Sequence, residues 1–210
     1  MKKIMFNDAY GLTDATIEGR KTMTRRAEFS DEEQQVLNEA DDVYMDGDDV
    51  VAHFDSAEDV RFGTRYKVGE IVAVAQSYED AGFTKGYYRD EDTLIPIFRG
   101  DDTEKDIAVS PAGWRNKMFT RADLMPHRIR ITGIKVERLQ DISYFDCLNE
   151  GIYCGSCFCG NKYGLQIGSG VIWLGYTAKD AFALLIDKVS GRGTWESNPW
   201  VVAYEYELVK

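Results

Sequence analysis

The C-terminal stretch WVVAYEYEL, residues 200–208, has the pattern that most restricts how this chain can fold. Two sets of residues alternate along it: Val202, Tyr204, Tyr206 and Leu208 against Val201, Ala203, Glu205 and Glu207. A period of two places each set on one face of a β-strand, so we predict a terminal strand with one face buried. Further strand-like runs occur at residues 3–6, 68–78 and 127–139, the last as a strand pair or a strand bent at Gly133.

Helical patterns are fewer and do not alternate with the strands. They fit residues 11–20, 31–39, 143–150 and, most clearly, 177–191. This order argues against a layered sheet of the Rossmann type. We therefore predict an α+β fold, a small mixed or antiparallel β-barrel with flanking helices. Residues 79–108 are expected to form long loops around one strand at residues 94–98.

The acidic residues are concentrated in one segment. Residues 27–60 contain no Lys or Arg but 13 of the 36 acidic residues, which leaves 23 acidic against 25 basic residues elsewhere. We predict a single domain over residues 1–210 that carries an acidic insertion at about 27–62. This insertion is either a solvated surface or a surface that docks a basic partner.

The composition excludes several classes of protein. With 44% hydrophobic and 29% charged residues, the chain is typical of a globular protein. It has no run of about 18 apolar residues and no apolar core of a secretion signal near its start, so we expect a cytoplasmic protein without a membrane partner. The net charge of -11 argues against sequence-blind binding of duplex nucleic acid, which needs many phosphate contacts from Lys and Arg.

The cysteines raise three alternatives. Three of the four lie in the segment YCGSCFCG, within a predicted loop at about 153–175. Their spacing could supply thiolates to zinc, with a fourth ligand from elsewhere; the residues concerned are Cys154, Cys157 and Cys159, with Cys147, His53 or His127. Reduced thiols in a surface loop are the second alternative, and a disulfide is the third.

Residues 18–26, EGRKTMTRR, form a basic segment in this acidic chain, which we call the clasp. Its basic residues are Arg20, Lys21, Arg25 and Arg26. Since the clasp follows the predicted helix at 11–20, its cations can line a pocket for a nucleotide-like ligand. Alternatively, they only interact favourably with the dipole at the end of that helix.

The clasp carries a resemblance to a known family. The residues GRKTMTRR fit the pattern G-x-K-x-x-(E or T)-x-R of the ASCH family, with Gly19, Lys21, Thr24 and Arg26 in the patterned places. ASCH domains are a branch of the PUA-like β-barrels. The resemblance therefore implies a PUA-like mixed β-barrel with flanking helices.

The likeness extends to ASCH-like proteins of bacteriophages and prophages. It includes the segments YKVGEIVAV, MP followed by a basic strand, ERLQDIS, EGI and WESNPWV. These matches run in order from Met5 to Leu208, interrupted by the acidic insertion and by the cysteine segment. Proteins of this fold bind RNA or read modified bases, and one small ASCH branch hydrolyses the amide of acetylated cytidine.

The resemblance to that hydrolytic branch is incomplete. Its members use a Lys and a Thr of this motif together with a Glu on a later strand, and Lys21 and Thr24 match the first two. Where relatives carry the Glu, this chain has Arg130 or Gln76. Other carboxylates could substitute, and the sequence does not choose among Glu70, Glu79 and Glu137. A threonine hydroxyl also needs a base, which Lys21 can be only if its pKa is depressed.

The same substitutions suit binding. The amide of Gln76 can read the edge of a base without bringing a charge, and Arg128 and Arg130 can join the clasp in holding phosphate. Tyr78 and Trp114 can stack on a base. The predicted ligand-binding residues are Gly19, Arg20, Lys21, Thr24, Arg25, Arg26, Gln76, Ser77, Tyr78, Trp114, Arg128 and Arg130.

Three functional hypotheses follow. The first is binding of RNA or a modified nucleoside in a basic pocket, and the second is an amidohydrolase acting through Lys21 and Thr24. The third is a phage-derived interaction protein whose acidic insertion docks a basic partner. No metal and no cofactor is expected at the predicted site.

Overall fold

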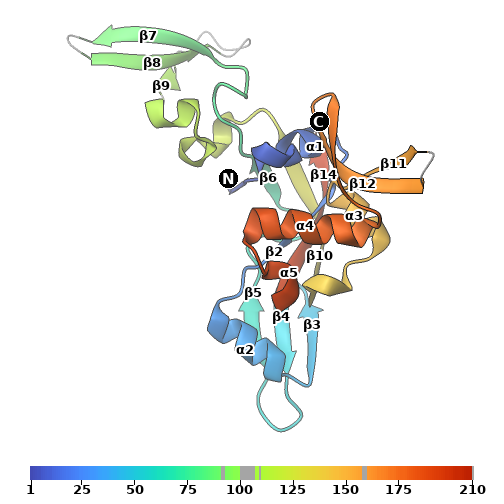
Figure 1. The fold of residues 1–210 in the computed structure, drawn as a ribbon. Helices are drawn as coiled ribbons and strands as arrows, with labels where there is room; N and C mark the ends of the chain where they lie inside the picture. The colour runs from blue at the N-terminus through green and yellow to red at the C-terminus, as the bar shows by residue number, and fades with distance from the viewer. Residues whose placement is uncertain (91–92, 100–106, 109, 158–159, 210) are drawn as a thin grey trace. The chain divides into compact units, whose positions relative to one another are not determined.

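The computed structural model describes residues 1–90, 93–99, 107–108, 110–157 and 160–209 (Figure 1). By compactness these residues divide into two units. Unit 1 comprises Met1–Phe6, Ile71–Ile129 and Val209–Lys210, and unit 2 comprises Asn7–Glu70 and Arg130–Leu208. The mixed α+β class predicted from the sequence is confirmed, whereas the single domain stays a prediction.

Unit 1 is built on a buried parallel strand pair. Strand β1 (Lys3–Ile4) pairs with β6 (Ile71–Val74), and Ile4 lies opposite Val74. The chain after β6 forms an antiparallel sheet of β7 (Thr84–Asp90), β8 (Thr93–Arg99) and β9 (Ile107–Ala108). The strand expected at residues 94–98 is confirmed as β8, but β7 and β9 occupy parts of the segments that were expected to be loops. Three short 3-10 helices follow: η2 (Pro111–Trp114), η3 (Lys117–Phe119) and η4 (Ala122–Leu124).

Tyr78 is at the centre of the core of unit 1. Its ring packs with Ala73 and Met125, and half-buried Trp114 lies against this cluster. A Cβ added to Gly113 would come within 2.5 Å of the Tyr78 ring, so only glycine allows this close approach. The phenol oxygen accepts a hydrogen bond from the backbone N–H of Arg121 at 3.1 Å.

The main strands of unit 2 surround its C-terminal strand. Strand β14 (Trp200–Val209) lies between β10 (Arg128–Arg138) and β2 (Met23–Arg26), and it runs antiparallel to β2. Strand β10 is continuous through Gly133, so a single strand is confirmed and the alternative of a strand pair was wrong. The four residues 201–204 of β14 are all buried, because this part of the strand is covered on both faces. Only beyond them does the predicted alternation appear, with exposed Glu205 and buried Tyr206.

The predicted helices are confirmed within one or two turns. They are α1 (Leu12–Ile17), α2 (Asp31–Glu39), α3 (Tyr144–Asn149) and α4 (Ala178–Ser190), to which the structure adds α5 (Thr194–Ser197) and the 3-10 helices η1 (Asp8–Tyr10) and η5 (Leu139–Asp141). The Thr177 hydroxyl caps α4 by accepting from the N–H of Asp180 at 3.0 Å. Helix α4 packs against α3, α5 and strands β12 and β13 (Figure 1).

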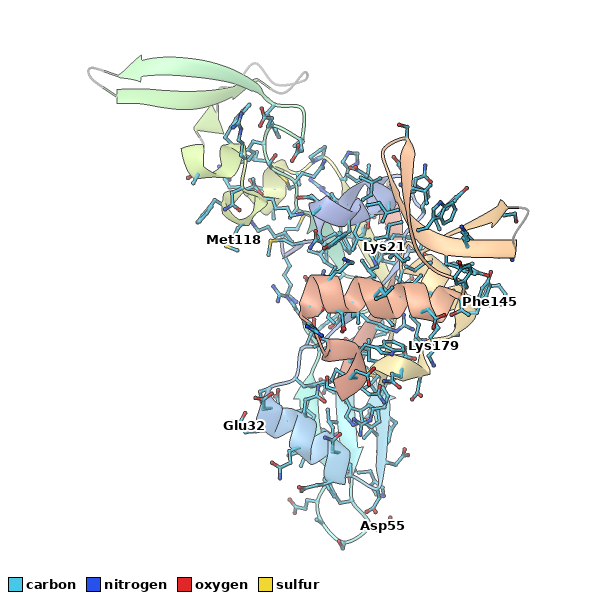
Figure 2. The ribbon with its side chains drawn as sticks, in the orientation of Figure 1. Lys21, Glu32, Asp55, Met118, Phe145 and Lys179 are labelled. Atoms are coloured by element: carbon cyan, nitrogen blue, oxygen red, sulfur yellow. The ribbon has the colours of Figure 1, made fainter. Side chains whose placement is uncertain are left out.

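The acidic insertion folds into a helix and a small sheet. Helix α2 is followed by β3 (Asp42–Asp46), β4 (Asp49–His53) and β5 (Val60–Gly63), which pair in that order. Ser30 and Glu33 close a capping box at the start of α2. Leu37 and the middle of β4 are buried, whereas acidic side chains such as Glu32 and Asp55 point outward (Figure 2).

The cysteine segment is not a loop. It contributes to an antiparallel sheet of β11 (Tyr153–Cys157), β12 (Gly160–Ile167) and β13 (Gly170–Gly175). The pairings among the described residues leave every sheet open, so the predicted barrel is not confirmed. Among all the residues that the structure describes, no helix has the length and apolar character that crossing a membrane requires.

Candidate functional site

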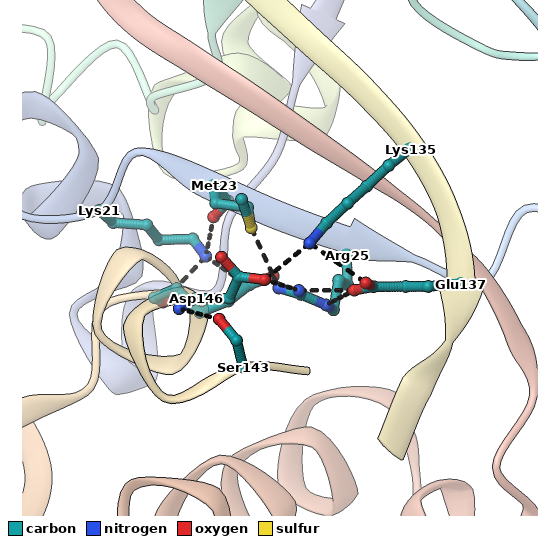
Figure 3. Close-up of polar contacts among 8 residues, drawn as sticks. Lys21, Met23, Arg25, Lys135, Glu137, Ser143 and Asp146 are labelled. Carbon is teal, nitrogen blue, oxygen red and sulfur yellow. Dashed lines mark hydrogen bonds and ion pairs between the residues drawn. The ribbon is translucent and has the colours of Figure 1, made fainter. Parts of the chain in front are cut away.

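From Lys21 onward, the clasp is largely buried. Its central residue, Lys21, is 2% exposed and lies just before strand β2. The ammonium group donates three hydrogen bonds: to the carbonyl oxygen of Met23 at 2.7 Å, to that of Glu150 at 2.9 Å and to the Glu150 carboxylate at 2.6 Å (Figure 3). Three acceptors match the three protons of a charged lysine.

Arg25 continues the same cluster two residues further along β2. Its guanidinium group contacts three carboxylates: Glu137 at 2.6 Å, Asp146 at 2.8 Å and Glu150 at 3.2 Å. Lys135 in turn pairs with Asp146 at 2.7 Å and Glu137 at 3.1 Å. We call this group the ion cluster; it consists of Lys21, Arg25 and Lys135 with Glu137, Asp146 and Glu150 (Figure 3).

Local sequence signals place the carboxylates of the ion cluster. The Ser143 hydroxyl caps α3 by accepting from the N–H of Asp146 at 3.1 Å. Asp146 lies in the first turn of α3, and Glu150 is the C-cap residue of the same helix. Because the two are four residues apart, their side chains project on the same side. Lys135 and Glu137 are two residues apart on β10, so their side chains lie on the same face of the strand. This face is turned toward α3, where Lys135 pairs with Asp146. The predicted elements therefore bring the charges together, although their residues are far apart in the chain.

Burial and ion pairing oppose each other in the ion cluster. Burial lowers the pKa of Lys21, and the Glu150 carboxylate limits that decrease. Burial acts on Arg25 in the same direction, but Glu150 and Glu137 outweigh it and its pKa is raised. Burial alone would raise the pKa of Asp146, whereas Lys135 and Arg25 hold it below the ordinary value. The lowered pKa holds the Asp146 carboxylate in its charged form.

This geometry changes the role of the clasp. Two of its cations, Lys21 and Arg25, already have carboxylate partners, so each would have to break an ion pair to hold a phosphate. Arg20 pairs with Glu18 at 2.6 Å near the surface, and Gly19 adopts φ +74° where the chain turns out of α1. Arg26 is half-buried.

Thr24 lies on a different face from most of the ion cluster. Side chains alternate along β2, so Met23 and Arg25 face one way and Thr24 the other. Thr24 lies opposite Tyr204 of β14. The phenol of Tyr204 donates to Glu28 at 2.6 Å and packs edge-on against Tyr66. The hydroxyl of Thr24 is buried in this aromatic environment.

The carboxylate that approaches Lys21 is one that the sequence analysis missed. Glu150 was not among the three candidates, although it begins the segment EGI of the family resemblance, and that was the signal that could have identified it. Of the candidates, Glu137 belongs to the ion cluster but contacts Arg25 and Lys135. Glu79 instead pairs with Arg115.

The resemblance segments ERLQDIS and WESNPWV contact each other in unit 2. The backbone N–H of Gln140 donates to the Asn198 side chain at 2.8 Å, and the Gln140 amide donates to the carbonyl of Trp195 at 2.8 Å. The Arg138 guanidinium lies 4.5 Å from the centre of the Trp200 ring. These residues hold the chain together where β14 begins.

The remaining predicted site residues of unit 1 have separate roles. Tyr78 is fully buried, so the prediction that its ring stacks on a base was wrong. Ser77 donates to Asp80 and accepts from its N–H. Gln76 is 7% exposed, and its amide N–H₂ points to the carbonyl of Asp80 at 3.5 Å. Its amide oxygen is buried and has no hydrogen-bond partner in the described structure.

The predicted arginines differ from each other in exposure. Arg128 is half-buried at the start of β10. Arg130, in unit 2, is exposed and pairs with Glu207 at 3.1 Å. That ion pair is solvent-exposed and adds little stability.

The cysteines are described only in part. Cys147 and Cys154 are free thiols, and burial raises the pKa of Cys147 to about 11. The side chain of Cys157 and all of Cys159 lie outside the described residues. Within the part that is described, no three His, Cys, Asp or Glu side chains are grouped as a metal site would require.

Comparisons of the chain with protein-family models, with curated proteins and with solved structures gave no significant match.

Proposed function

We propose that this protein binds RNA or a modified nucleoside, and that Gln76 reads the base. The observation that carries the proposal is the buried amide oxygen of Gln76, which lacks a hydrogen-bond partner among the described residues. Leaving such a group unsatisfied costs about 1–3 kcal/mol. A ligand N–H that reaches this oxygen would recover that energy.

The chemistry of the amide fits the edge of a base. Its oxygen accepts from an exocyclic amino group or a ring N–H, and it does so without bringing a charge into a buried place. Half-buried Trp114 and Arg128 belong to the same unit. They are candidates for stacking and for phosphate contact. The resemblance to ASCH-like proteins, and the PUA-like barrel that it implies, are part of this proposal.

Calorimetric titration with a panel of standard and modified nucleosides, and with short single-stranded RNA, tests it. We expect Gln76→Leu to weaken binding by about 10-fold or more, because the ligand donor loses its acceptor. Gln35→Leu is the matched control, since Gln35 bonds only within α2, to Glu39. If the parent protein binds nothing in the panel, the proposal is wrong.

A second candidate, an amidohydrolase, is supported by the contact of Lys21 with Glu150. That pair supplies the carboxylate that the sequence lacked at its expected positions. In such a reaction the Thr24 hydroxyl would attack the amide carbonyl of an acetylated nucleoside. The acyl group would pass to Thr24 and then to water, and the amine would leave with a proton. In the described state Lys21 has all three protons engaged and Thr24 lies on the other face of β2, so this candidate requires Lys21 to give up a proton and the two side chains to approach each other.

Release of acetate from acetylated cytidine separates the two candidates. Hydrolysis predicts turnover by the parent protein, none by Thr24→Ala and some by Thr24→Ser. Binding without turnover would leave the first proposal standing and remove the second.

A further inference from the structure

The sheet β11–β12–β13 of unit 2 has one face that is covered at its central strand and one open face; at the edge of the covered face, Ile172 of β13 is 50% exposed. Tyr163 and Leu165 of β12 are buried and lie on the covered face. On the open face, Tyr153 of β11 is 39% exposed and Trp173 of β13 is 46% exposed. Large aromatic side chains that stay this exposed are candidates for contact with a ligand.

The register of the sheet sets these two rings side by side. Tyr153 lies opposite Gly164 of β12, and Gly164 lies opposite Trp173. The middle member of this row has no side chain. The ring centroids of Tyr153 and Trp173 are therefore only 6.0 Å apart, with an angle of 43° between the planes.

Glycines on the other two strands of the sheet, β11 and β12, make room for this arrangement. A Cβ added to Gly155 of β11 would lie 2.3 Å from the Trp173 ring, and one added to Gly164 would lie 2.1 Å from the carbonyl oxygen of Ile172. A larger residue at either position would displace the indole or the strand. The indole thus lies against the backbone of β11 in a set position, with its outer side exposed.

The charged side chains carried by the strands of this sheet have the opposite sign to the net charge of the whole chain. Residues 151–179 contain no Asp or Glu, although the chain has 36. Lys162 of β12 lies opposite Gly155 in the register, so it projects on the same face as Trp173. Gln166 follows it on that face. An aromatic pair beside a cation, with no carboxylate on its strands, complements a ligand that has both planar rings and negative charge.

We propose that this open face binds single-stranded nucleic acid. Tyr153 and Trp173 would stack on unpaired bases, and Lys162 would contact the phosphate backbone. A single strand alternates bases and phosphates, which matches the two kinds of group on this face better than an apolar protein surface does. The proposal is independent of Gln76, which belongs to the other unit.

Fluorescence anisotropy with labelled 12-nucleotide oligo-U and oligo-dU, which differ only in the sugar, tests it on the full-length protein. We expect Trp173→Ala and Tyr153→Ala each to weaken binding by about 5-fold or more, from the stacking lost per base. Trp173→Phe should keep most of the affinity, because a ring remains. Lys162→Gln should make log Kd less dependent on log salt concentration by about 0.7.

Tyr44→Ala is the matched control, because Tyr44 is 40% exposed but lies on β3 of the acidic insertion; its affinity should equal that of the parent. Binding of both oligomers indicates stacking indifferent to the sugar, and binding of RNA alone adds a contact to the 2′-hydroxyl. Trp173→Ala should weaken oligomer binding equally in the Gln76→Leu background, which separates this surface from the proposed nucleoside site. No binding by the parent, or binding unchanged in both Trp173→Ala and Tyr153→Ala, overturns the proposal.

Discussion

The buried charge of Lys21 needs a compensating carboxylate. Moving an ammonium group out of water costs several kcal/mol, and only good geometry with further hydrogen bonds repays it. Glu150 supplies both, through its carboxylate and its backbone carbonyl. The hydrogen-bonding capacity of the Lys21 ammonium group is therefore filled by groups of the protein, without a ligand.

Replacing Lys21 by methionine should destabilise the fold strongly, because it leaves Glu150 buried without its closest cation. We expect the free energy of unfolding to fall by about 3–5 kcal/mol. Urea denaturation followed by tryptophan fluorescence measures it. The double variant Lys21→Met/Glu150→Met should recover part of the loss.

Arg20→Met is the control for this prediction. Arg20 forms an exposed pair with Glu18, so its loss should cost no more than about 1 kcal/mol. A small effect of Lys21→Met, comparable to that of Arg20→Met, would contradict the role assigned to the ion cluster.

The stability should also depend on pH through Asp146. Its pKa is lowered in the folded chain, so the unfolded state takes up a proton at higher pH. The resulting stabilisation is complete above the unfolded pKa of about 3.9 and is lost as the pH falls through the lower folded value. Denaturation curves between about pH 6 and pH 3 should fall less steeply with acid in Asp146→Asn than in the parent. Glu58→Gln, at an exposed position, should leave the slope unchanged.

At the scale of the elements, the side chain of Gln34 connects helix α2 to the C-terminal strand β14. The amide of Gln34 donates to the carbonyl of Trp200 at 2.7 Å and accepts from its N–H at 2.9 Å. The side chain thus pairs with both backbone groups of one residue, as a neighbouring strand would. This contact joins the acidic insertion to the start of β14 within unit 2.

Gln34→Ala should loosen this attachment. Two lost hydrogen bonds correspond to about 1–2 kcal/mol. Hydrogen exchange should increase throughout α2 rather than only at its ends. Gln35→Ala has the same change of helix propensity but loses only a bond to Glu39, so equal exchange in both variants would argue against the attachment.

For the whole molecule, the acidic insertion accounts for the net charge. Residues 31–63 contain 12 of the 36 acidic residues and one of the 25 basic ones, so the remaining chain has 24 of each. The insertion also has buried residues of its own, in Leu37 and β4. A folded segment with buried residues of its own therefore carries the excess negative charge of the chain.

Replacing residues 31–63 by a short flexible linker should raise the isoelectric point from about 4.7 toward neutrality. It should also strengthen binding of oligo-U at low salt, because the repulsion of phosphate is removed. Anisotropy at two salt concentrations measures this, and circular dichroism checks that the remainder is folded. Weaker binding in the shortened protein would instead show that the insertion takes part in recognition.

Much of the secondary structure could be predicted from local patterns. Ser143 and Thr177 cap the helices that were predicted to begin there, and β14 was predicted as an alternating strand. Strands β3 and β7 were missed because polar or glycine-containing strands lack that signal, whereas β8 was predicted from its apolar residues. The cysteine segment was misread for the same reason, since its glycines are typical of loops until a neighbouring strand pairs with them.

The sequence by itself determined the clasp, the helix caps and the uneven distribution of charge, because each depends on residues close together in the chain. Only the tertiary structure decided which carboxylates pair with the cations of the clasp. Lys21 meets Glu150 across 129 positions, and Arg25 meets Glu137 across 112. Which carboxylate neutralises a buried cation depends on how strands and helices pack, and no local pattern encodes that distance. The same holds for Trp173, whose position against Gly155 exists only once β11, β12 and β13 are paired in register.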